Sequence, residues 1–437
     1  MKLHTILYII ILIIHCANAG FVKVGKDGNF EEDGKRYIIW GANFWQGMNL
    51  GAKNTGNRTR LMNDLDKMKS MGINNLRIIA ASEGPISIQK PKIVLMPEPG
   101  VYNEDMFEGL DYVLYQLKKR GMKAVMVLNN FWHWSGGFAQ YVSWFKKTNI
   151  PFPPGYPEND PLANHTWGEM GDYSASFYTC KECVDLWKKH IKTVINRINI
   201  FTGQCYRDDD TIFSWEFANE PRQNDDGTIP MNDEFIEDVS GYIKSLDKNH
   251  LVVLGSEALA DPFGKEVFLR ENSPKNIDYL TSHIWVQNRG EYDPKNKDEA
   301  NLQHAIEYCI NHLRETSKWA IQLNKPIVFE EYGMARDGWD GLDEYDPNSP
   351  YTNRLKFYKA ILDEVYNLTK QNIYQGQSFW AYSGEGRPAP GDHRDLYLGD
   401  PAHEHPGWYG IYDKDVDIIN YLKEMGEKFL ALEKFSN

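Results

Sequence analysis

Short apolar runs alternate with amphipathic, helix-like patterns along almost the whole chain. Eight of these runs have the length of a buried strand, and they span residues 37–44, 75–80, 124–129, 212–217, 251–255, 279–284, 327–331 and 377–381. Segments of helical periodicity lie between and after them, at residues 58–71, 104–120, 183–200, 234–246, 300–323, 353–366 and 416–432. Strands that alternate with helices pair in parallel within one sheet. Eight such units predict an α/β fold, the (β/α)₈ barrel.

The alternative architecture is an open, doubly wound parallel sheet. Its common signature, Gly-x-Gly-x-x-Gly after the first strand, is absent from the sequence. No linker, repeat or low-complexity segment divides the chain, so residues 20–437 are expected to form a single catalytic domain. Because a barrel carries its active site at the carboxyl ends of its strands, two long connections are predicted to form loops on that face, residues 82–101 and 131–179.

Residues 1–19 have the pattern of an export signal that is removed. Lys2 supplies a positive charge, an apolar run follows, and Ala17-Asn18-Ala19 forms a small-x-small cleavage site before Gly20. No other stretch approaches transmembrane length, so no membrane contact is expected after cleavage. We expect a secreted protein, extracellular or periplasmic if the host is Gram-negative, and we expect it to act as a monomer.

Acidic residues outnumber basic ones, 61 to 48, which gives a formal net charge of −13. A chain with this charge is a poor candidate for binding nucleic acid or an anionic membrane. The composition instead suits a neutral substrate.

Four of the five cysteines lie beyond the export signal, at Cys180, Cys183, Cys205 and Cys309. They allow three disulfide pairings, between which the sequence does not distinguish. The Cys-x-x-Cys spacing of the first two is also found in zinc sites, but no second such pair accompanies it. We therefore expect no metal and no cofactor.

Two acids follow apolar strands at positions where the chain must turn. Glu220 ends the run Ile212-Phe213-Ser214-Trp215-Glu216-Phe217-Ala218-Asn219 and precedes Pro221, while Glu331 ends the run that begins at Pro326 and is followed by Tyr332 and Gly333. Parallel strands of a barrel bring such tips together. Two converging carboxyl groups are what the hydrolysis of a glycosidic bond requires.

The two acids are given different roles. We expect Glu220 to be the acid/base, with a pKa raised by its negative neighbour. Glu331 is expected to remain ionised as the nucleophile, supported by Arg77 at the end of the second strand. Of the adjacent acids, Glu330 is expected to point to the opposite face of its strand, and Glu216 to lie deeper in a structural ion pair.

Other polar and aromatic residues at strand tips are predicted to bind the substrate. Asn219 is placed to contact a sugar 2-hydroxyl, His283 to position the acid/base and Trp380 to lie beneath the sugar ring. The remaining candidates at or just beyond the tips are Asn129, Asn130, Trp132, Trp134 and Trp285.

At these residues the sequence resembles glycoside hydrolase family 5, whose members are retaining (β/α)₈ enzymes. Asn219-Glu220-Pro221 resembles the family's acid/base signature, and Glu331-Tyr332-Gly333 resembles its nucleophile signature. The likeness extends from about Phe21 to the C terminus. It implies an active-site set made of Arg77, Asn219, Glu220, His283, Glu331 and Trp380.

Four stretches are similar, more specifically, to the endo-β-1,4-mannanases of that family, particularly bacterial ones: residues 41–45, 128–132, 214–222 and 379–387. The first two place Trp45 and Trp132 beside the cleft. The resemblance implies internal cleavage of β-mannan, galactomannan or glucomannan with retention of configuration.

The sequence departs from the family pattern at two places. Many members carry a tyrosine, bonded to the nucleophile, where this chain has Trp285, so that bond is either absent or made by the indole N–H. Asn129-Asn130 stand where cellulase-like relatives often carry histidine, which favours a mannanase.

Three alternatives remain open. The first is an endo-β-1,4-glucanase of the same fold, and the second is a non-catalytic glycan-binding barrel. The third is a metal-dependent hydrolase that uses Asp392, His393, His403 and His405, although their spacing matches no known ligand pattern.

Overall fold

A barrel of eight parallel strands forms the centre of the structure, a computed structural model that describes residues 20–85, 87–156, 160–224, 228–258, 264–338, 349–389 and 394–435. The strands are β4 (Ile39–Asn43), β5 (Asn75–Ile79), β6 (Lys123–Val127), β7 (Ile212–Glu216), β8 (Leu251–Val253), β9 (Leu280–Ile284), β10 (Ile327–Tyr332) and β11 (Tyr374–Phe379). They pair in the order β8-β7-β6-β5-β4-β11-β10-β9, and a parallel bridge between Val253 and Tyr279 joins the two ends. The predicted barrel is confirmed, and every predicted strand lies within three residues of its observed bounds.

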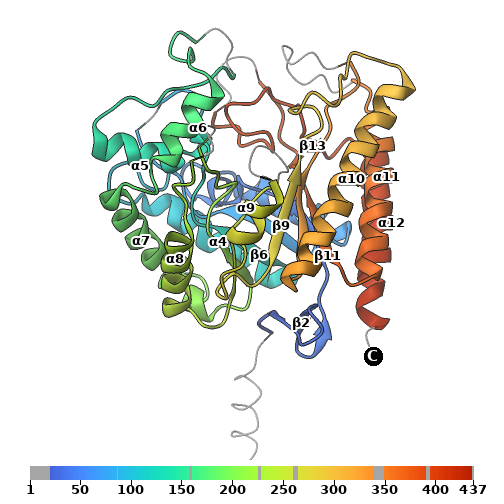
Figure 1. The fold of residues 1–437 in the computed structure, drawn as a ribbon, viewed down its shortest axis with the longest axis horizontal. Helices are drawn as coiled ribbons and strands as arrows, with labels where there is room; N and C mark the ends of the chain where they lie inside the picture. The colour runs from blue at the N-terminus through green and yellow to red at the C-terminus, as the bar shows by residue number, and fades with distance from the viewer. Residues whose placement is uncertain are drawn as a thin grey trace, which may run out of the picture.

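Helices surround the barrel (Figure 1), and α10, α11 and α12 lie side by side along one flank. The main helices are α3 (Arg58–Ser70), α4 (Glu104–Arg120), α7 (Lys181–Ile195), α8 (Asp233–Leu246), α9 (Gly264–Glu271), α10 (Glu299–Leu323), α11 (Thr352–Lys370) and α12 (Val416–Ala431). Every predicted helix is present; α9 is an addition, and its eight residues span barely two turns.

The ends of α4 show how local sequence fixes these boundaries. The side chain of Asn103 accepts a hydrogen bond from the Asp105 N–H, and two acids occupy the first turn, where the helix dipole favours negative charge. Gly121 ends the helix with φ +58°, a left-handed conformation that glycine adopts without steric cost.

A small N-terminal sheet closes the amino end of the barrel. Its antiparallel strands are β1 (Lys23–Val24), β2 (Phe30–Glu32) and β3 (Lys35–Arg36), at the end of the molecule away from the long loops (Figure 1). Phe30 is fully buried and packs edge-to-face on Phe213 and Tyr279, with ring centroids 5.1 and 5.3 Å apart. The barrel is thus a packed core at this end, and its opposite end is left for a site.

The expectation that residues 131–179 form a long loop is only partly right. This segment contains a 3₁₀ turn at His133–Ser135 and the helices α5 (Gly137–Lys146) and α6 (Trp167–Ala175). Phe138, Tyr141 and Val142 recur at helical spacing and are buried, so aromatic residues that suggested a substrate-binding loop form one face of α5. Other short elements above the barrel are α2 (Gly47–Gly51), β12 (Tyr382–Gly384) and β13 (Ile411–Tyr412).

Cys180 and Cys183 form a disulfide at the start of α7. The sequence left this pairing open, and Cys205 and Cys309 are free thiols. None of the helices in the described part of the chain combines the length and apolar character needed to cross a bilayer. The predicted export signal, residues 1–19, lies outside the described residues.

Candidate active site

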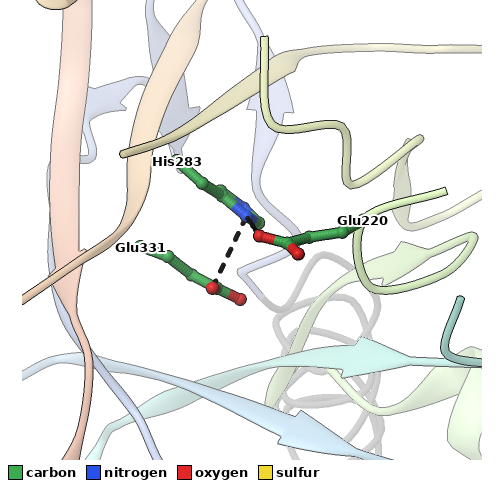
Figure 2. Close-up of side chains that lie close together, drawn as sticks. All are labelled: Glu220, His283 and Glu331. Carbon is green, nitrogen blue, oxygen red and sulfur yellow. Dashed lines mark hydrogen bonds and ion pairs between the residues drawn. The ribbon is translucent and has the colours of Figure 1, made fainter. Parts of the chain in front are cut away.

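Glu220 and Glu331 converge at the carboxyl end of the barrel. An oxygen of each carboxyl group and a ring nitrogen of His283 all lie within 4.8 Å of one another (Figure 2). Retaining glycosidases hold their carboxyl groups about 5–5.5 Å apart, whereas inverting enzymes need about 6.5–9.5 Å to admit a water. The arrangement therefore fits a retaining mechanism. Both side chains are buried, with only 6% and 3% of their surfaces exposed.

The backbone of Glu220 has an unusual conformation for a residue with a side chain. Its φ is +49°, in the left-handed region, and it precedes Pro221, a position that favours extended backbone. Hydrogen bonds hold it there: the Glu220 N–H donates to Gly255 O over 3.0 Å, and the Asn219 N–H donates to Asn129 O over 3.0 Å. Backbone strain that neighbouring strands maintain is frequent at active sites.

Arg77 connects the nucleophile candidate to its surroundings. Its guanidinium donates to both carboxyl oxygens of Glu216, at 2.8 and 2.5 Å, to Asn219 Oδ1 at 2.8 Å, and to Glu331. The predicted pairing of Arg77 with Glu331 and the structural role of Glu216 thus agree with the geometry. The same contacts orient the Asn219 side chain beside the pocket.

Glu330 does not point away from the site, although the sequence predicts that it does. Strict alternation would direct it away from Glu331, but the pairing of β10 with β9 shifts register between Phe329 and Glu331. As a result Glu330 is also buried at the centre, with Oε2 3.2 Å from His283 Nε2 and 3.6 Å from Arg77 Nε. The two neighbouring acids therefore both contact the catalytic network.

His283 bridges the acids as a fully buried cation. Its Nδ1 lies 2.8 Å from Glu220 Oε1 and 3.5 Å from Glu331 Oε2. Burial alone lowers the pKa of His283, but the charges of Glu331 and Glu220 and the hydrogen bonds to Glu220 and Glu330 raise it well above the usual value. The predicted contact between His283 and Glu220 is present.

The pKa values of the two acids differ from the expectation. Burial favours a higher pKa for Glu220, yet the hydrogen bond and charge of His283, together with Arg222, lower the pKa to about 2. Burial raises the pKa of Glu331 to about 7, against the attraction of His283 and Arg77. In the resting protein Glu220 is thus a carboxylate paired with the His283 cation, and the expected rise in its pKa is not observed.

A pocket of about 810 Å³ opens above the acids. Six indole rings contribute to its lining, those of Trp132, Trp134, Trp167, Trp285, Trp380 and Trp408. Trp132 Nε1–H donates to Glu220 Oε2 over 2.6 Å, so this ring both borders the pocket and orients the acid. Aromatic faces of this kind stack on the apolar faces of sugar rings.

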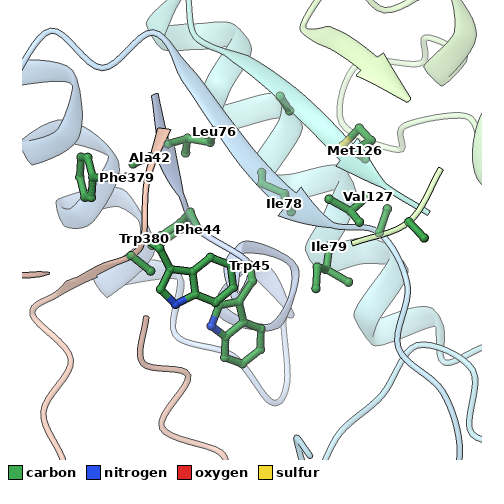
Figure 3. Packing of buried hydrophobic residues seen from close by; sticks show 14 of the residues in the cluster. Ala42, Phe44, Trp45, Leu76, Ile78, Ile79, Met126, Val127, Phe379 and Trp380 are labelled. Atoms are coloured by element: carbon green, nitrogen blue, oxygen red, sulfur yellow. The ribbon is translucent and has the colours of Figure 1, made fainter. Parts of the chain in front are cut away.

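Three predicted binding residues lie behind the pocket and are not among the described residues that line it. Asn129 and Asn130 are fully buried, and Asn130 Oδ1 accepts from Asn219 Nδ2 and from the Trp132 N–H, both at 3.0 Å. Trp45 packs among the buried side chains around β4 and β5 (Figure 3), with its indole N–H bonded to Gly399 O. The structure places these residues as supports for the pocket lining.

Trp285 does line the pocket but does not replace the tyrosine of other members. Within the described residues, no hydrogen bond joins its indole to Glu331, whose contacts are with Arg77 and His283. Its ring packs against Trp380 and Tyr409, at centroid distances of 5.9 and 4.7 Å. Of the two possibilities raised by the sequence, the bond is absent.

Polar residues that the sequence did not single out also line the pocket. Arg222 follows Glu220 by two positions, donates to Glu257 over 2.7 Å and stacks over Trp132 at 4.6 Å. Glu404 lies on the loop before α12, and its buried Oε2 has no hydrogen-bond partner. Burial and the nearby charges of Asp400, Glu331 and Glu220 raise the pKa of Glu404 well above its usual value.

The metal alternative receives no support from its own residues. His403 stacks on Trp134 with centroids 6.2 Å apart, and burial lowers its pKa to about 3. Asp392 and His393 lie outside the described residues. Across the described ranges, the one group with ligand-like spacing is Glu220, His283 and Glu331, and none of these residues belongs to that alternative.

Comparison with known proteins decides the family. A family model described as GH family 5 beta-mannosidase-like matches residues 19–434. The chain belongs to glycoside hydrolase family 5. Membership confirms the resemblance that the two signatures predicted, and it makes the protein a glycoside hydrolase by class.

Relatives within family 5 match over nearly the full length. A glycoside hydrolase family 5 mannosidase from Rhizomucor miehei is 40% identical, with a TM-score of 0.87 over 96% of this chain and 99% of that one. A variant of that enzyme, solved in complex with mannosyl-fructose, has a TM-score of 0.86 at 40% identity over 95% and 98% of the chains. Mannan endo-1,4-beta-mannosidase 1 from Solanum lycopersicum is 27% identical over 90% of this chain and 91% of its own length.

Proposed function

We propose that the protein is a secreted, retaining glycoside hydrolase that cuts internal β-1,4 bonds of mannan, galactomannan or glucomannan. The observation that carries the proposal is the pair of carboxyl groups, Glu220 and Glu331, held within 4.8 Å beneath an indole-lined pocket. Similarity to the tomato mannan endo-1,4-beta-mannosidase over about nine-tenths of both chains supports the substrate class. The pattern of residues 1–19 supports secretion.

In the first step, Glu331 attacks the anomeric carbon of the mannosyl unit. As the new C–O bond forms, the glycosidic C–O bond breaks and Glu220 delivers a proton to the leaving oxygen. The product is a covalent glycosyl ester on Glu331. Before the attack, Arg77 forms an ion pair with Glu331. This ion pair is lost when Glu331 becomes an uncharged ester, while the ion pair with Glu216 still holds the Arg77 side chain in position.

In the second step, Glu220 accepts a proton from a water molecule that attacks the same anomeric carbon. The ester bond breaks, Glu331 leaves as a carboxylate, and the configuration of the substrate is retained after two inversions. Asn219, oriented by Arg77 and Asn130, is placed to contact the sugar 2-hydroxyl, an interaction that strengthens in the transition state.

The first experiment measures reducing-sugar release from linear mannan, galactomannan, glucomannan and carboxymethylcellulose, for the wild type and Glu331→Ala. Release from the mannans that disappears in the variant supports both substrate class and nucleophile. Activity confined to carboxymethylcellulose would replace the proposal with a glucanase, and no release from any substrate would favour a glycan-binding protein.

A second candidate is a mannosidase that acts on chain ends or short oligosaccharides. The observation that favours it is that two loop segments in contact with each other add to the pocket wall: Pro154 and Gly155, before α6, and residues between Pro401 and Trp408, before β13. The Rhizomucor miehei mannosidase, at 40% identity, supports the same alternative. Product analysis separates the two: mannose alone from the earliest time points indicates chain-end action, whereas a ladder of oligosaccharides and a rapid fall in viscosity indicate internal cleavage.

A further inference from the structure

The His283 ring has a carboxyl group on each side. Glu220 Oε1 lies 2.8 Å from Nδ1, and Glu330 Oε2 lies 3.2 Å from Nε2. All three side chains are buried, and His283 has no exposed surface. A carboxylate accepts hydrogen bonds and does not donate them, which means that the nitrogen facing it must carry a proton.

We propose that Glu330 is a positioning residue that keeps the proton of His283 on Nε2, so that a single exchangeable proton is shared between His283 Nδ1 and Glu220 Oε1. The proposal rests on the function proposed above and extends it. Glu330 touches neither substrate nor reacting atoms; it acts through the imidazole.

The shared proton accounts for the acid step without uptake from water. In the resting pair, Nδ1–H of the His283 cation donates to the Glu220 carboxylate. When a leaving oxygen approaches Glu220, the proton moves from Nδ1 to Oε1 and on to that oxygen. The His283 ring is left neutral, with Nε2–H still donated to Glu330 and Nδ1 as an acceptor. In the second step, Glu220 takes a proton from the attacking water, and a proton returns from Glu220 Oε1 to His283 Nδ1.

Charged groups from several elements act on this pair. Glu220 follows β7, and Glu330 and Glu331 belong to β10. Arg77 of β5 pairs with Glu216 of β7, whose charge also interacts with His283. His312 of α10 is buried nearby, and burial together with the His283 charge lowers its pKa to about 3, so it remains neutral. Among these groups, Glu330 is the one that contacts Nε2.

The first test compares Glu330→Gln with Glu330→Met in the full-length protein. The amide oxygen of Gln still accepts from Nε2–H but carries no charge, whereas Met removes both the charge and the acceptor. We expect kcat/KM to fall in the order wild type, Gln, Met. We expect the basic limb of the pH profile to move to lower pH by about one unit in the Gln variant, because the charge that retains the shared proton is gone.

Glu216→Gln is the matched control. It removes an equally buried charge that pairs with Arg77, whereas the described carboxyl group at His283 Nε2 is that of Glu330, so a smaller shift of the basic limb is expected. Equal shifts in the Glu216 and Glu330 variants would overturn the proposal, since the effect would then depend only on total charge.

A spectroscopic measurement covers the case in which these variants fold poorly. The protein is labelled with ¹⁵N-histidine, and the His283 signals are assigned by their loss in His283→Asn. The proposal expects a protonated Nε2 in the wild type from pH 6 to pH 9, and an unprotonated Nε2 there overturns it. This readout needs no substrate, so a failure of the mannan assays would refute the proposed function and leave the tautomer result standing.

Discussion

At the scale of single residues, the site is a cluster of buried groups of opposite charge in direct contact. Two cations, Arg77 and His283, face the buried carboxyl groups of Glu216, Glu220, Glu330 and Glu331. Removing such groups from water costs free energy, which their mutual attraction and hydrogen bonds only roughly offset. The network therefore contributes orientation more than stability, and orientation is what a reaction at Glu220 and Glu331 requires.

Substitution of the two acids separates their roles. Glu331→Ala should lower kcat by roughly 10⁴-fold or more, and azide should partly restore turnover by forming a glycosyl azide of inverted configuration. Glu220→Ala should remain active on an aryl glycoside with a good leaving group, because that oxygen leaves without protonation. Product configuration by NMR checks both. A glycosyl azide of inverted configuration from the Glu220 variant would instead identify Glu220 as the nucleophile and Glu331 as the acid/base. The control is Glu237→Ala, which changes an exposed acid on α8 and should behave as wild type.

Glu404 is expected to bind a sugar hydroxyl as a neutral acid. Its Oε2 is buried without a partner at the pocket wall, and a protonated carboxyl both donates and accepts hydrogen bonds, as an amide does. Glu404→Gln should therefore keep KM within a few-fold, whereas Glu404→Leu should raise it about tenfold, equivalent to one lost hydrogen bond. Steady-state kinetics on mannan oligosaccharides measure this, and a Leu variant with unchanged KM would remove Glu404 from substrate binding.

At the scale of elements, the strands could be predicted because each lies inside the barrel. A parallel strand covered on both faces is an apolar run, and β5 (Asn75–Ile79) and β7 (Ile212–Glu216) are completely buried. The small N-terminal strands lack that signal, since each has only two or three residues. The sequence does not distinguish α5 from a loop, because aromatic residues at this spacing also suit a substrate-binding wall.

Some residues of the candidate site could also be predicted from sequence, and others could not. Glu220 and Glu331 could be placed from sequence because they stand at or just beyond strand ends. Arg77 was expected at the end of its strand but is the third of the five residues of β5, from where its long side chain reaches Glu331. The contact of Glu330 with His283 depends on a register shift in β10, which no local pattern encodes. Glu404 is distant from both acids in sequence and reaches the pocket by tertiary folding, and the lowered pKa of Glu220 follows from the His283 charge beside it.

The N-terminal sheet contributes to stability and lies far from the chemistry. Phe30→Ala should lower the free energy of unfolding by about 3–4 kcal/mol, because it removes a fully buried ring from the closed end of the barrel. Activity well below the unfolding temperature should be unchanged. Urea denaturation and kcat measure the two effects; Ile321→Ala, an exposed position on α10, should change stability by less than about 0.5 kcal/mol. A large loss of kcat in Phe30→Ala would contradict the separation.

At the scale of the whole molecule, buried acids link stability to pH. Burial raises the pKa of Glu83 to about 8 and the pKa of Glu271 to about 7. Two buried histidines act in the opposite sense: burial lowers the pKa of His190 to about 4 and, with the charges of His283 and Arg289, that of His312 to about 3. Their combination determines the pH at which the fold is most stable.

Proton linkage determines whether each group raises or lowers the free energy of unfolding as pH changes. A carboxyl group with a raised pKa binds more protons in the folded chain, so the free energy of unfolding falls as pH rises from the ordinary value near 4.5 through the folded value. A buried neutral histidine gives a free energy that rises with pH, but only up to its ordinary pKa of 6.5. Above pH 6.5 the buried acids and His283, whose pKa is also raised, all lower the free energy of unfolding as pH rises, so stability should decline.

Glu83 should account for much of that decline, since it is the buried acid whose pKa is raised to about 8. Its Oε2 accepts the Gly137 N–H over 2.8 Å, a bond that a glutamine oxygen can keep. Glu83→Gln should therefore fold, and its free energy of unfolding should fall less steeply from pH 6.5 to 8, by up to about 1.4 kcal/mol per pH unit. Lys90 and Lys325, whose pKa values burial lowers to about 8, act in the opposite sense as pH approaches 8. Urea titrations at four pH values measure the slopes. Parallel slopes for Glu83→Gln and wild type would show that the folded chain carries Glu83 ionised, and Glu237→Gln should reproduce the wild-type slope.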